Sequence, residues 1–171
     1  MLTKKPETKP KPSKKKKARI EIRQMNLEDL SEVWHLGEKI FTPSYLPFTY
    51  RTWNVDELLS LYSGEPELCL VAENMYSRKI VGFALGYILE RPSSRWKYGY
   101  FNWVGVQKIR QKSGIGKRLY REMEKRFKQK GARIAIADVE NNNLEATCFF
   151  KGQGFKEAQR YVWFSKNIEE N

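Results

Sequence analysis

The sequence predicts a mixed α/β fold, in which a mostly antiparallel central sheet with one parallel strand pair carries helices on both faces. Three observations predict it. Apolar runs with strand character are interspersed with segments of helical periodicity, one strand–helix–strand unit requires a crossover connection, and the 171-residue chain has the usual length of one domain. With 40% hydrophobic and 13% aromatic residues, the chain can build a core.

The N-terminal residues differ in composition from the rest of the chain. Residues 1–19 carry nine lysines and arginines against one acid, whereas residues 20–171 carry 23 against 19, so most of the net charge of +12 lies in the tail. Prolines recur there and no large apolar residue follows Leu2, so we expect residues 1–18 to be disordered and residues 19–171 to form the domain. The tail is either a solvated extension or an arm that contacts ribosome, RNA or another polyanion through residues 1–19.

The first elements follow this tail. Residues 19–25 alternate as a strand, and Asn26 is a candidate N-cap for a helix with an apolar stripe from Leu27 to Ile40. Residues 41–53 hold two prolines and five aromatics, and they are expected either to line a pocket or to join an aromatic core. Asn54 is predicted to cap a short second helix that ends at Gly64.

The remaining elements form the sheet and its crossover. Three apolar runs, residues 67–73, 80–90 and 98–106, predict an antiparallel meander. A helix is expected from about Gly114 to Lys130, since apolar residues recur at every fourth position on one face: Ile115, Leu119, Met123 and Phe127. Residues 132–139 should then lie parallel to residues 98–106, because a crossover helix joins the two strands. A short helix within residues 143–154 and final strands within residues 155–168 complete the predicted order.

Two cysteines and the absence of long apolar runs narrow the class of protein. Cys69 and Cys148 each lie in an apolar run without a second cysteine nearby, so both are expected to be buried, reduced thiols rather than part of a metal or redox site. No segment approaches the roughly 18 consecutive apolar residues of a membrane helix, and the N-terminus lacks the apolar core of a signal peptide. We therefore expect a soluble cytoplasmic protein without a metal, as a monomer or a homodimer.

Residues 111–117, "QKSGIGK", lie between the end of a strand and the start of a helix. They do not form a P-loop, since Gln111 stands five residues before Gly116, and Leu119 stands where a dinucleotide fingerprint needs its third glycine. Glycines at positions 114 and 116 remove Cβ atoms, so that N–H groups of the first helical turn can converge on an anion. Such a compact site suits a pyrophosphate better than a nucleic-acid duplex. The alternative is a plain loop before a basic helix.

In these residues the chain resembles the GNAT superfamily of acetyl-CoA-dependent N-acetyltransferases. Two of its motifs are present in order. The first is a strand ending in Val106 followed by the glycine pattern of residues 111–116, and the second is Asn143, Ala146 and Phe150 followed by Gly154-Phe155. The resemblance implies the acyl-CoA N-acyltransferase fold, with strands 98–106 and 132–139 splayed apart. It also implies an enzyme that moves an acetyl group from acetyl-CoA to a primary amine by direct attack in a ternary complex.

The resemblance also implies which residues bind acetyl-CoA. The backbone of Val104, Gly105 and Val106 would bind the pantetheine arm and the thioester, and Asn143 would contact the arm near the sulfur, although it is also a good helix N-cap. Phe150 stands at a cofactor-contacting position where the family usually has a tyrosine that serves as the acid. The pyrophosphate would bind the segment formed by Gln111, Lys112, Ser113, Gly114, Ile115, Gly116 and Lys117.

The candidates for proton transfer are carboxylates and tyrosines. Asp138 lies five residues before Asn143 and would act as a base through a water, or else it is only a paired carboxylate at a strand end. Glu90 is a second candidate base. Because phenylalanine donates no proton, the acid would be Tyr161, Tyr100 or a water.

The acceptor is expected to be a protein or peptide, through an α-amine or a lysine. Residues 41–53 and the last predicted hairpin would line the acceptor site, and both are aromatic and nearly free of acid, which disfavours a polyamine. Residues 40–45 also look like the corresponding loop of protein N-terminal acetyltransferases. The alternatives are an acetyltransferase of a small amine, or a catalytically weak GNAT-fold module that binds ribosome or RNA through its tail.

Overall fold

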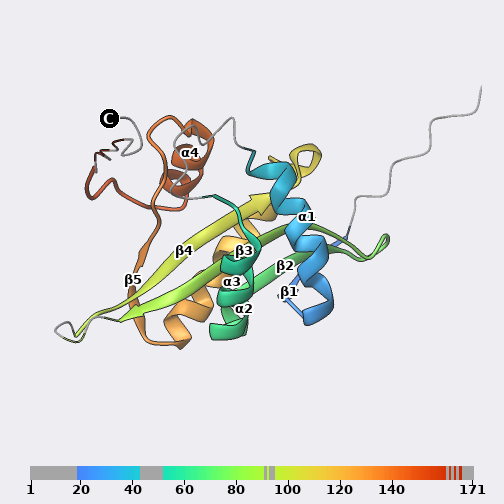
Figure 1. Ribbon diagram of the computed structural model, residues 1–171, viewed down its shortest axis with the longest axis horizontal. Helices are drawn as coiled ribbons and strands as arrows, with labels where there is room; N and C mark the ends of the chain where they lie inside the picture. The colour runs from blue at the N-terminus through green and yellow to red at the C-terminus, as the bar shows by residue number, and fades with distance from the viewer. Residues whose placement is uncertain are drawn as a thin grey trace, which may run out of the picture.

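The computed structural model describes residues 19–42, 52–90, 92, 95–160, 162, 164 and 166. The basic tail, most of the aromatic segment 41–53 and Tyr161 lie outside these residues. Within them, five strands form one sheet in the order β1-β2-β3-β4-β5 (Figure 1). The described elements are β1 (Ile20–Gln24), α1 (Leu30–Ile40), α2 (Val55–Gly64), β2 (Cys69–Asn74), β3 (Lys79–Glu90), β4 (Lys97–Val106), α3 (Ile115–Gln129), β5 (Ala132–Ile136) and α4 (Leu144–Gly152).

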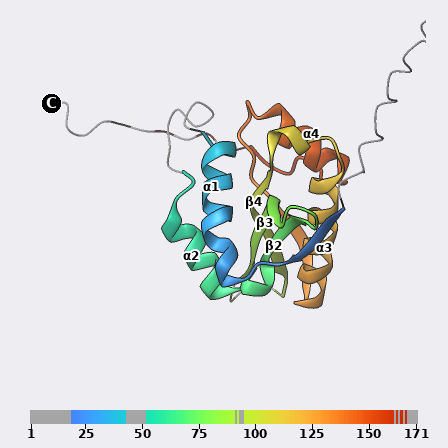
Figure 2. The same cartoon turned by 90° about the vertical axis from the view of Figure 1, so that its right-hand side faces the viewer.

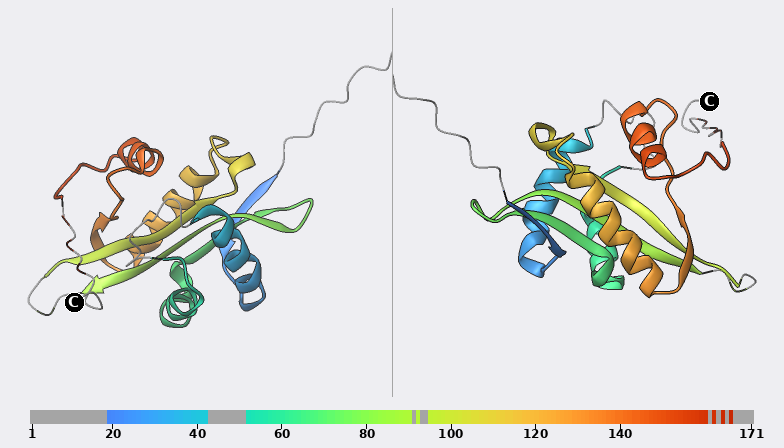
Figure 3. Two further views of the ribbon diagram at one scale, coloured as in Figure 1. Left: turned by 45° about the horizontal axis from the view of Figure 1, so that its top comes forward. Right: turned by 180° about the vertical axis from the view of Figure 1, so that it is seen from behind.

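The sheet has the predicted topology. Strands β1 to β4 are antiparallel neighbours, and β4 and β5 pair in parallel across the α3 crossover. Each face of the sheet is covered by its own cluster of buried apolar side chains. One lies between the sheet and helices α3 and α4, and the other between the sheet and helices α1 and α2. Figures 2 and 3 show these two pairs of helices on opposite faces of the sheet. The stripe predicted for α3 is buried on the first face. The two faces can therefore present different groups to the same strand.

Local hydrogen bonds explain where the helices on the second face begin. The side chain of Asn54 accepts a hydrogen bond from the N–H of Glu57 at 2.8 Å, which confirms the predicted N-cap of α2. At Asn26 the chain enters α1 through a short 3₁₀ turn, and the backbone N–H of Asn26 donates to the Asp29 carboxylate at 2.8 Å. These caps satisfy N–H groups that the helices leave without intrahelical partners.

The described ends of the aromatic segment belong to the core. Phe41 packs against Trp103 with ring centroids 4.6 Å apart, and Trp53 is 8% exposed beneath α1. The Trp53 ring lies so close to Gly37 that a Cβ atom there would approach it to 2.1 Å, and its indole N–H donates to the Trp34 carbonyl at 3.1 Å. Of the two alternatives for residues 41–53, Phe41 and Trp53 therefore join the aromatic core and do not line a pocket.

The strand predicted in residues 155–160 and the burial predicted for Cys148 are wrong, and most of residues 161–168 lie outside the described part of the chain. Residues 155–160 form no strand, because the N–H of Phe155 donates to the Phe150 carbonyl at 3.1 Å and its side chain packs into the first cluster, while residues 156–160 are exposed. Alternation of side chains does not make a strand unless a neighbouring edge accepts its backbone hydrogen bonds. Cys148 is exposed on α4, whereas Cys69 is buried in β2, where burial raises the pKa of its thiol to about 12.

No helix in the described part of the chain has both the length and the apolar composition needed to cross a membrane.

The contact between Gly37 and Trp53 predicts a large cost for one methyl group. Gly37→Ala should lower the free energy of unfolding by about 2–3 kcal/mol, because the buried indole ring has to move. Denaturant titration measures this. The matched control is Gly64→Ala in α2, where nothing lies within 4 Å of the added Cβ, and it should leave stability unchanged or raise it by about 0.5 kcal/mol. Equal effects of the two substitutions would contradict the packing argument.

Candidate active site

Strand β4 is hydrogen-bonded to its two neighbouring strands over different lengths. Its parallel ladder with β5 runs from Lys97 to Tyr100, whereas its antiparallel ladder with β3 continues to Val106. Figure 1 shows the chain after β5 turning away from β4 toward α4. Among the described residues, Val104, Gly105 and Val106 therefore pair with a strand on the β3 side alone. This is the splayed pair that the resemblance implies, and it leaves backbone groups that an extended ligand can satisfy.

A β-bulge lies just beyond the end of the β5 ladder. Leu85 faces Trp103 and Gly86 faces Phe101, so Asn102 is the extra residue. Both Asn102 and Trp103 reach the same carboxylate on α2. Asn102 Nδ2 lies 2.9 Å from one Glu57 oxygen, and Trp103 Nε1 lies 2.8 Å from the other. The bulge is thus held in place from the α2 face.

The glycine segment forms an open turn at the start of α3. Gly114 has φ +86°, Lys112 has φ +58°, and nothing lies within 4 Å of a Cβ built at Gly114. The first helical hydrogen bond at this end runs from the Arg118 N–H to the Gly114 carbonyl at 3.1 Å. Within the described residues, the N–H groups of residues 115–117 meet no backbone carbonyl. They are therefore available to an anion at the positive end of α3.

Two further observations show that this turn fits an anionic group. The Nε of Arg110, four residues before Gly114, is buried without a hydrogen-bond partner among the described residues. Lys112 and Lys117 are exposed beside the turn. A Cβ at position 116 would come within 3.2 Å of the Phe149 ring, so Gly116 allows α3 and α4 to approach closely. We call residues 110–117 the anion cradle.

The structure brings Asp138 together with Tyr100. The Tyr100 hydroxyl on β4 donates to the Asp138 carboxylate, which lies two residues past the end of β5. Tyr87 stacks on Tyr100 with ring centroids 4.9 Å apart. This hydrogen bond joins β4 to the chain after β5 where the two diverge. Tyr100 and Asp138 therefore lie where β4 and the chain after β5 begin to separate. The anion cradle follows the end of β4, where the two segments are already apart.

The other two proton-transfer candidates are not part of this cluster. Glu90 is the exposed last residue of β3, and its carboxylate lies 2.6 Å from Lys97 Nζ. It lies three residue pairs, about 10 Å, beyond the Tyr87–Tyr100 pair. Tyr161 is outside the described residues.

Phe150 and Asn143 both have structural roles. The Phe150 ring packs against Phe101 and Phe155, with centroids 5.9 and 5.1 Å away, in a cluster that also holds Tyr120. Burial, with smaller contributions from Glu124, raises the pKa of Tyr120 to about 12, so its hydroxyl remains protonated at neutral pH. The Asn143 side chain accepts from the Ala146 N–H at 3.0 Å and caps α4.

The sequence prediction missed a pocket on the α2 face. Its volume is about 350 Å³, and its lining residues are Glu57, Ser60, Leu61, Gly64, Glu65, Tyr87 and Asn102. Two carboxylates contribute to it, whereas the segments expected to line the acceptor site, residues 41–53 and the last predicted hairpin, are nearly free of acid and lie mostly outside the described residues. A glutamate at position N3 of a helix can reach back to the backbone N–H of the N-cap residue. At Glu57 the carboxylate instead reaches β4, and no sequence signal marks that contact.

A search for metal-binding groups finds no cluster of three or more histidines, cysteines or acids in the part of the chain that the structure describes.

Comparisons with known proteins agree with this geometry. The profile of the acetyltransferase (GNAT) family matches residues 30–155. No curated protein matches the chain. Among solved structures, aminoglycoside N-acetyltransferase AAC(6')-Iy in complex with CoA has a TM-score of 0.67 at 20% identity, covering 90% of this chain and 98% of its own.

Two further solved structures share the fold. The NatC complex bound to Gag peptide and CoA has a TM-score of 0.71 at 17% identity, over 82% of this chain and 87% of its own. Aminoglycoside antibiotic 6'-N-acetyltransferase AAC(6')-Ih from Acinetobacter baumannii has a TM-score of 0.69 at 20% identity, over 88% and 99%. At such identities the likeness shows the fold alone.

The anion cradle predicts a charge-specific loss of binding. Gly114→Asp should raise the Kd for acetyl-CoA about tenfold or more, because it places a carboxylate where the phosphates are expected. Isothermal titration measures the Kd. Gly131→Asp is the matched control, since Gly131 also has φ +86° but lies just beyond the opposite end of α3. Both variants introduce the same backbone strain, of about 1 kcal/mol, so equal losses of binding would show that strain rather than charge is responsible.

Proposed function

Because the chain belongs to the acetyltransferase (GNAT) family, we propose that it transfers an acetyl group from acetyl-CoA to a primary amine that approaches from the α2 face of the sheet. The observation that carries this proposal is the Tyr100–Asp138 hydrogen bond, formed where β4 and the chain after β5 diverge. The cradle lies at the start of α3, on the other face. The two substrates would therefore meet at β4 from opposite sides.

The residues for the cosubstrate follow from this geometry. Residues 111–117 would hold the pyrophosphate through their N–H groups and the flanking lysines. The backbone of Val104, Gly105 and Val106 would hold the pantetheine arm as an added strand does, with Asn143 and Phe150 beside it. When bound, acetyl-CoA supplies the acetyl group as an activated thioester. An N–H of β4 near Val106 would donate to the carbonyl oxygen as negative charge develops there.

Proton removal is assigned to Tyr100 and Asp138. An amine attacks only when neutral, so a proton has to leave the acceptor. The Tyr100 hydroxyl already donates to Asp138. Its oxygen can therefore accept the amine proton, directly or through a water, while its own proton passes to the carboxylate. Phe150 cannot act as the acid, and Tyr100 would return the proton to the leaving thiolate.

Two acceptor classes have support from different parts of the chain. The aromatic, acid-poor segments favour the α-amine of a protein or peptide, or a lysine, but most of their residues lie outside the described part. The carboxylates of Glu57 and Glu65 in the pocket also suit a small cationic amine. A mass-spectrometric screen of acetyl transfer over peptide N-termini, lysines and small amines would identify the acceptor.

Removing either member of the tyrosine–aspartate pair should slow acetyl transfer. For Asp138→Asn and Tyr100→Phe we expect kcat to fall about 100-fold, with the Kd for acetyl-CoA changed less than about threefold. Steady-state kinetics on the best acceptor, together with titration of acetyl-CoA, measure the two effects. Tyr98→Phe is the matched control, because it removes a hydroxyl from the same strand two residues away. If kcat in all three variants equals that of the wild type, the pair has no role in proton transfer.

A second candidate function is contact with a polyanion through the basic tail. Residues 1–18 of the tail lie outside the described residues. The domain surface around Arg19, where the described chain begins, is basic. A hollow of about 580 Å³ between β1 and α3 is lined by Arg19, Arg118, Arg121 and Lys125, together with Ile20, Glu21, Ile22 and Glu122. Arg118 also donates to the Ile20 carbonyl at 3.0 Å. We propose that residues 1–19 and this hollow together bind RNA phosphates.

Deleting residues 1–18 tests the independence of this function. The deletion should weaken RNA binding and flatten its salt dependence, since fewer counterions are released, while acetyl transfer to a small amine stays unchanged. Filter binding at several salt concentrations, beside the transfer assay, measures both effects. An unchanged salt dependence would exclude the tail as the contact, and loss of acetyl transfer would show that the tail belongs to the enzyme site.

A further inference from the structure

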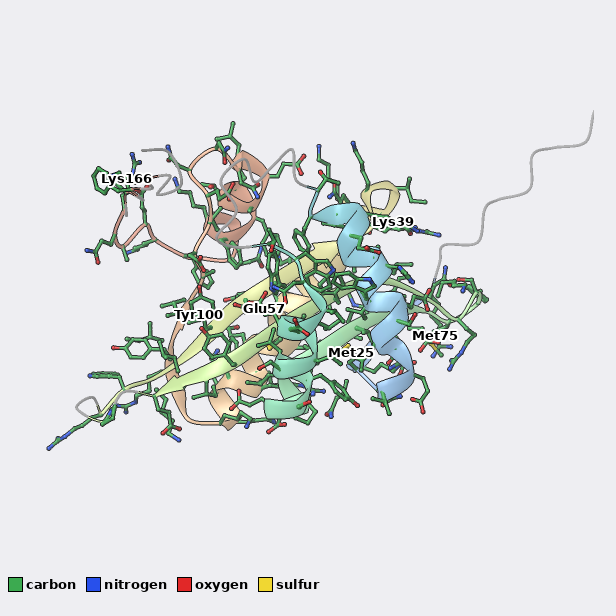
Figure 4. The ribbon with its side chains drawn as sticks, in the orientation of Figure 1. Met25, Lys39, Glu57, Met75, Tyr100 and Lys166 are labelled. Carbon is green, nitrogen blue, oxygen red and sulfur yellow. The ribbon has the colours of Figure 1, made fainter. Side chains whose placement is uncertain are left out.

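We propose that the pocket on the α2 face that Glu57 lines, here called the Glu57 pocket, binds a second cationic group of the acceptor. The preferred substrate then carries an ammonium or guanidinium group besides the amine that is acetylated. This inference rests on the proposed function and names the substrate feature that the pocket recognises. Figure 4 shows Glu57 on α2 and Tyr100 on the neighbouring β4.

The first argument is that the described part of the chain pairs no cation with the carboxylate of Glu57. Its two oxygens accept hydrogen bonds from neutral donors, the Asn102 amide and the Trp103 indole. Among the described residues, no lysine, arginine or histidine lies within ion-pair distance of it. A carboxylate has about four acceptor positions, and these two bonds occupy two of them. The half-buried carboxylate is therefore held in place by two neutral donors and can accept further hydrogen bonds from a cationic donor.

Other partly or fully buried carboxylates in the structure differ from Glu57 in this respect. Glu65, in the same pocket, accepts from the Ile88 N–H at 2.8 Å and lies 3.6 Å from Lys130 Nζ. Glu73, which is buried, lies 2.7 Å from Arg23 Nε. Among the described residues, these carboxylates have cationic partners, whereas the partners of Glu57 are neutral. The pattern favours a cation supplied by a ligand.

The second argument is the position of the pocket beside the Tyr100–Asp138 pair. Tyr87 lines the pocket and also stacks on Tyr100, so its ring separates the two places. Asn102, which contacts Glu57, lies two residues beyond Tyr100 on β4, a distance of about 7 Å. A spacer of a few methylene groups, along Leu61 and the Tyr87 ring, joins two nitrogens over that distance. An aromatic ring beside the pocket also attracts a cation.

The competing interpretation is that Glu57 only holds the β-bulge. Glu57→Gln separates the two, because glutamine keeps the shape and one acceptor oxygen but removes the charge. A role in the bulge alone predicts the same loss for every acceptor. A role in cation recognition predicts a loss that depends on the second charge of the acceptor.

The test compares cadaverine with pentylamine, which has the same carbon chain and one ammonium fewer. With the full-length wild type, kcat/KM should be at least about tenfold higher for cadaverine, mainly through KM, and this preference should shrink with added salt. In Glu57→Gln the ratio of the two kcat/KM values should fall at least about fivefold. Titration of cadaverine should show weaker binding to this variant, which gives a readout independent of turnover.

The matched control is Asp56→Asn, which removes the same charge from the same helix at an exposed position that does not line the pocket. It should keep the wild-type ratio. Two peptides that differ only in lysine or methionine at their second position form a parallel arm. A lysine preference lost in Glu57→Gln would assign the second cation to a peptide, and a preference limited to cadaverine would assign it to a small amine.

Three outcomes would overturn the inference. If the wild type acetylates both members of each pair equally well, the proposed function stands and the cation site is wrong. If Glu57→Gln slows both members of each pair to the same extent, Glu57 only supports the bulge. If no amine is acetylated at all, the proposed function fails and the inference fails with it.

Discussion

The structure depends on one unequal pairing: β4 stays hydrogen-bonded to β3 as far as Val106, but to β5 only as far as Tyr100. Backbone groups on the β5 side of residues 104–106 are therefore left for another partner. The bulge at Asn102 lies at this transition, and bulges increase the local twist of a strand, which fits the change of direction. Tyr100 and Asp138 meet where the divergence starts, and the anion cradle follows where β4 ends. The candidate site is thus a consequence of where one ladder stops.

The two faces of the sheet contribute different chemistry to that place. From one face, α3 presents backbone N–H groups at its start, and Gly116 lets α4 approach α3 closely. From the other face, α2 presents Glu57, whose position follows from the Asn54 cap and from its bonds to β4. Phosphates suit the first environment and a cation suits the second. In the proposed reaction, this separation would let two substrates of opposite charge reach the same strand without competing for the same groups.

Sequence reasoning predicted the elements with strong local signals and missed the contacts between distant ones. The glycine spacing of residues 111–117 and the stripe of α3 are local features, and the structure has the expected turn and helix. Glu57 looked like an ordinary residue of a first helical turn, because its partners Asn102 and Trp103 lie 45 and 46 positions away in the chain. The same limit explains Cys148, whose apolar neighbours predicted burial although α4 turns it to solvent.

By itself, the sequence determined the order of strands and helices through α4, the parallel crossover pair, the helix caps and the glycine turn before α3. The elements, caps and turn depend on residues within a few positions of one another, through backbone conformation, capping and side-chain periodicity. The parallel pair follows from the order strand, helix, strand, because a crossover connection joins parallel strands. Only the tertiary structure decided that β5 leaves β4 after Tyr100, that Tyr100 bonds to Asp138, and that α2 places beside the same strand a carboxylate with neutral hydrogen-bond donors. Each of these depends on contacts between segments that are far apart in the chain. Such contacts form only when the helices pack on the two faces of the sheet.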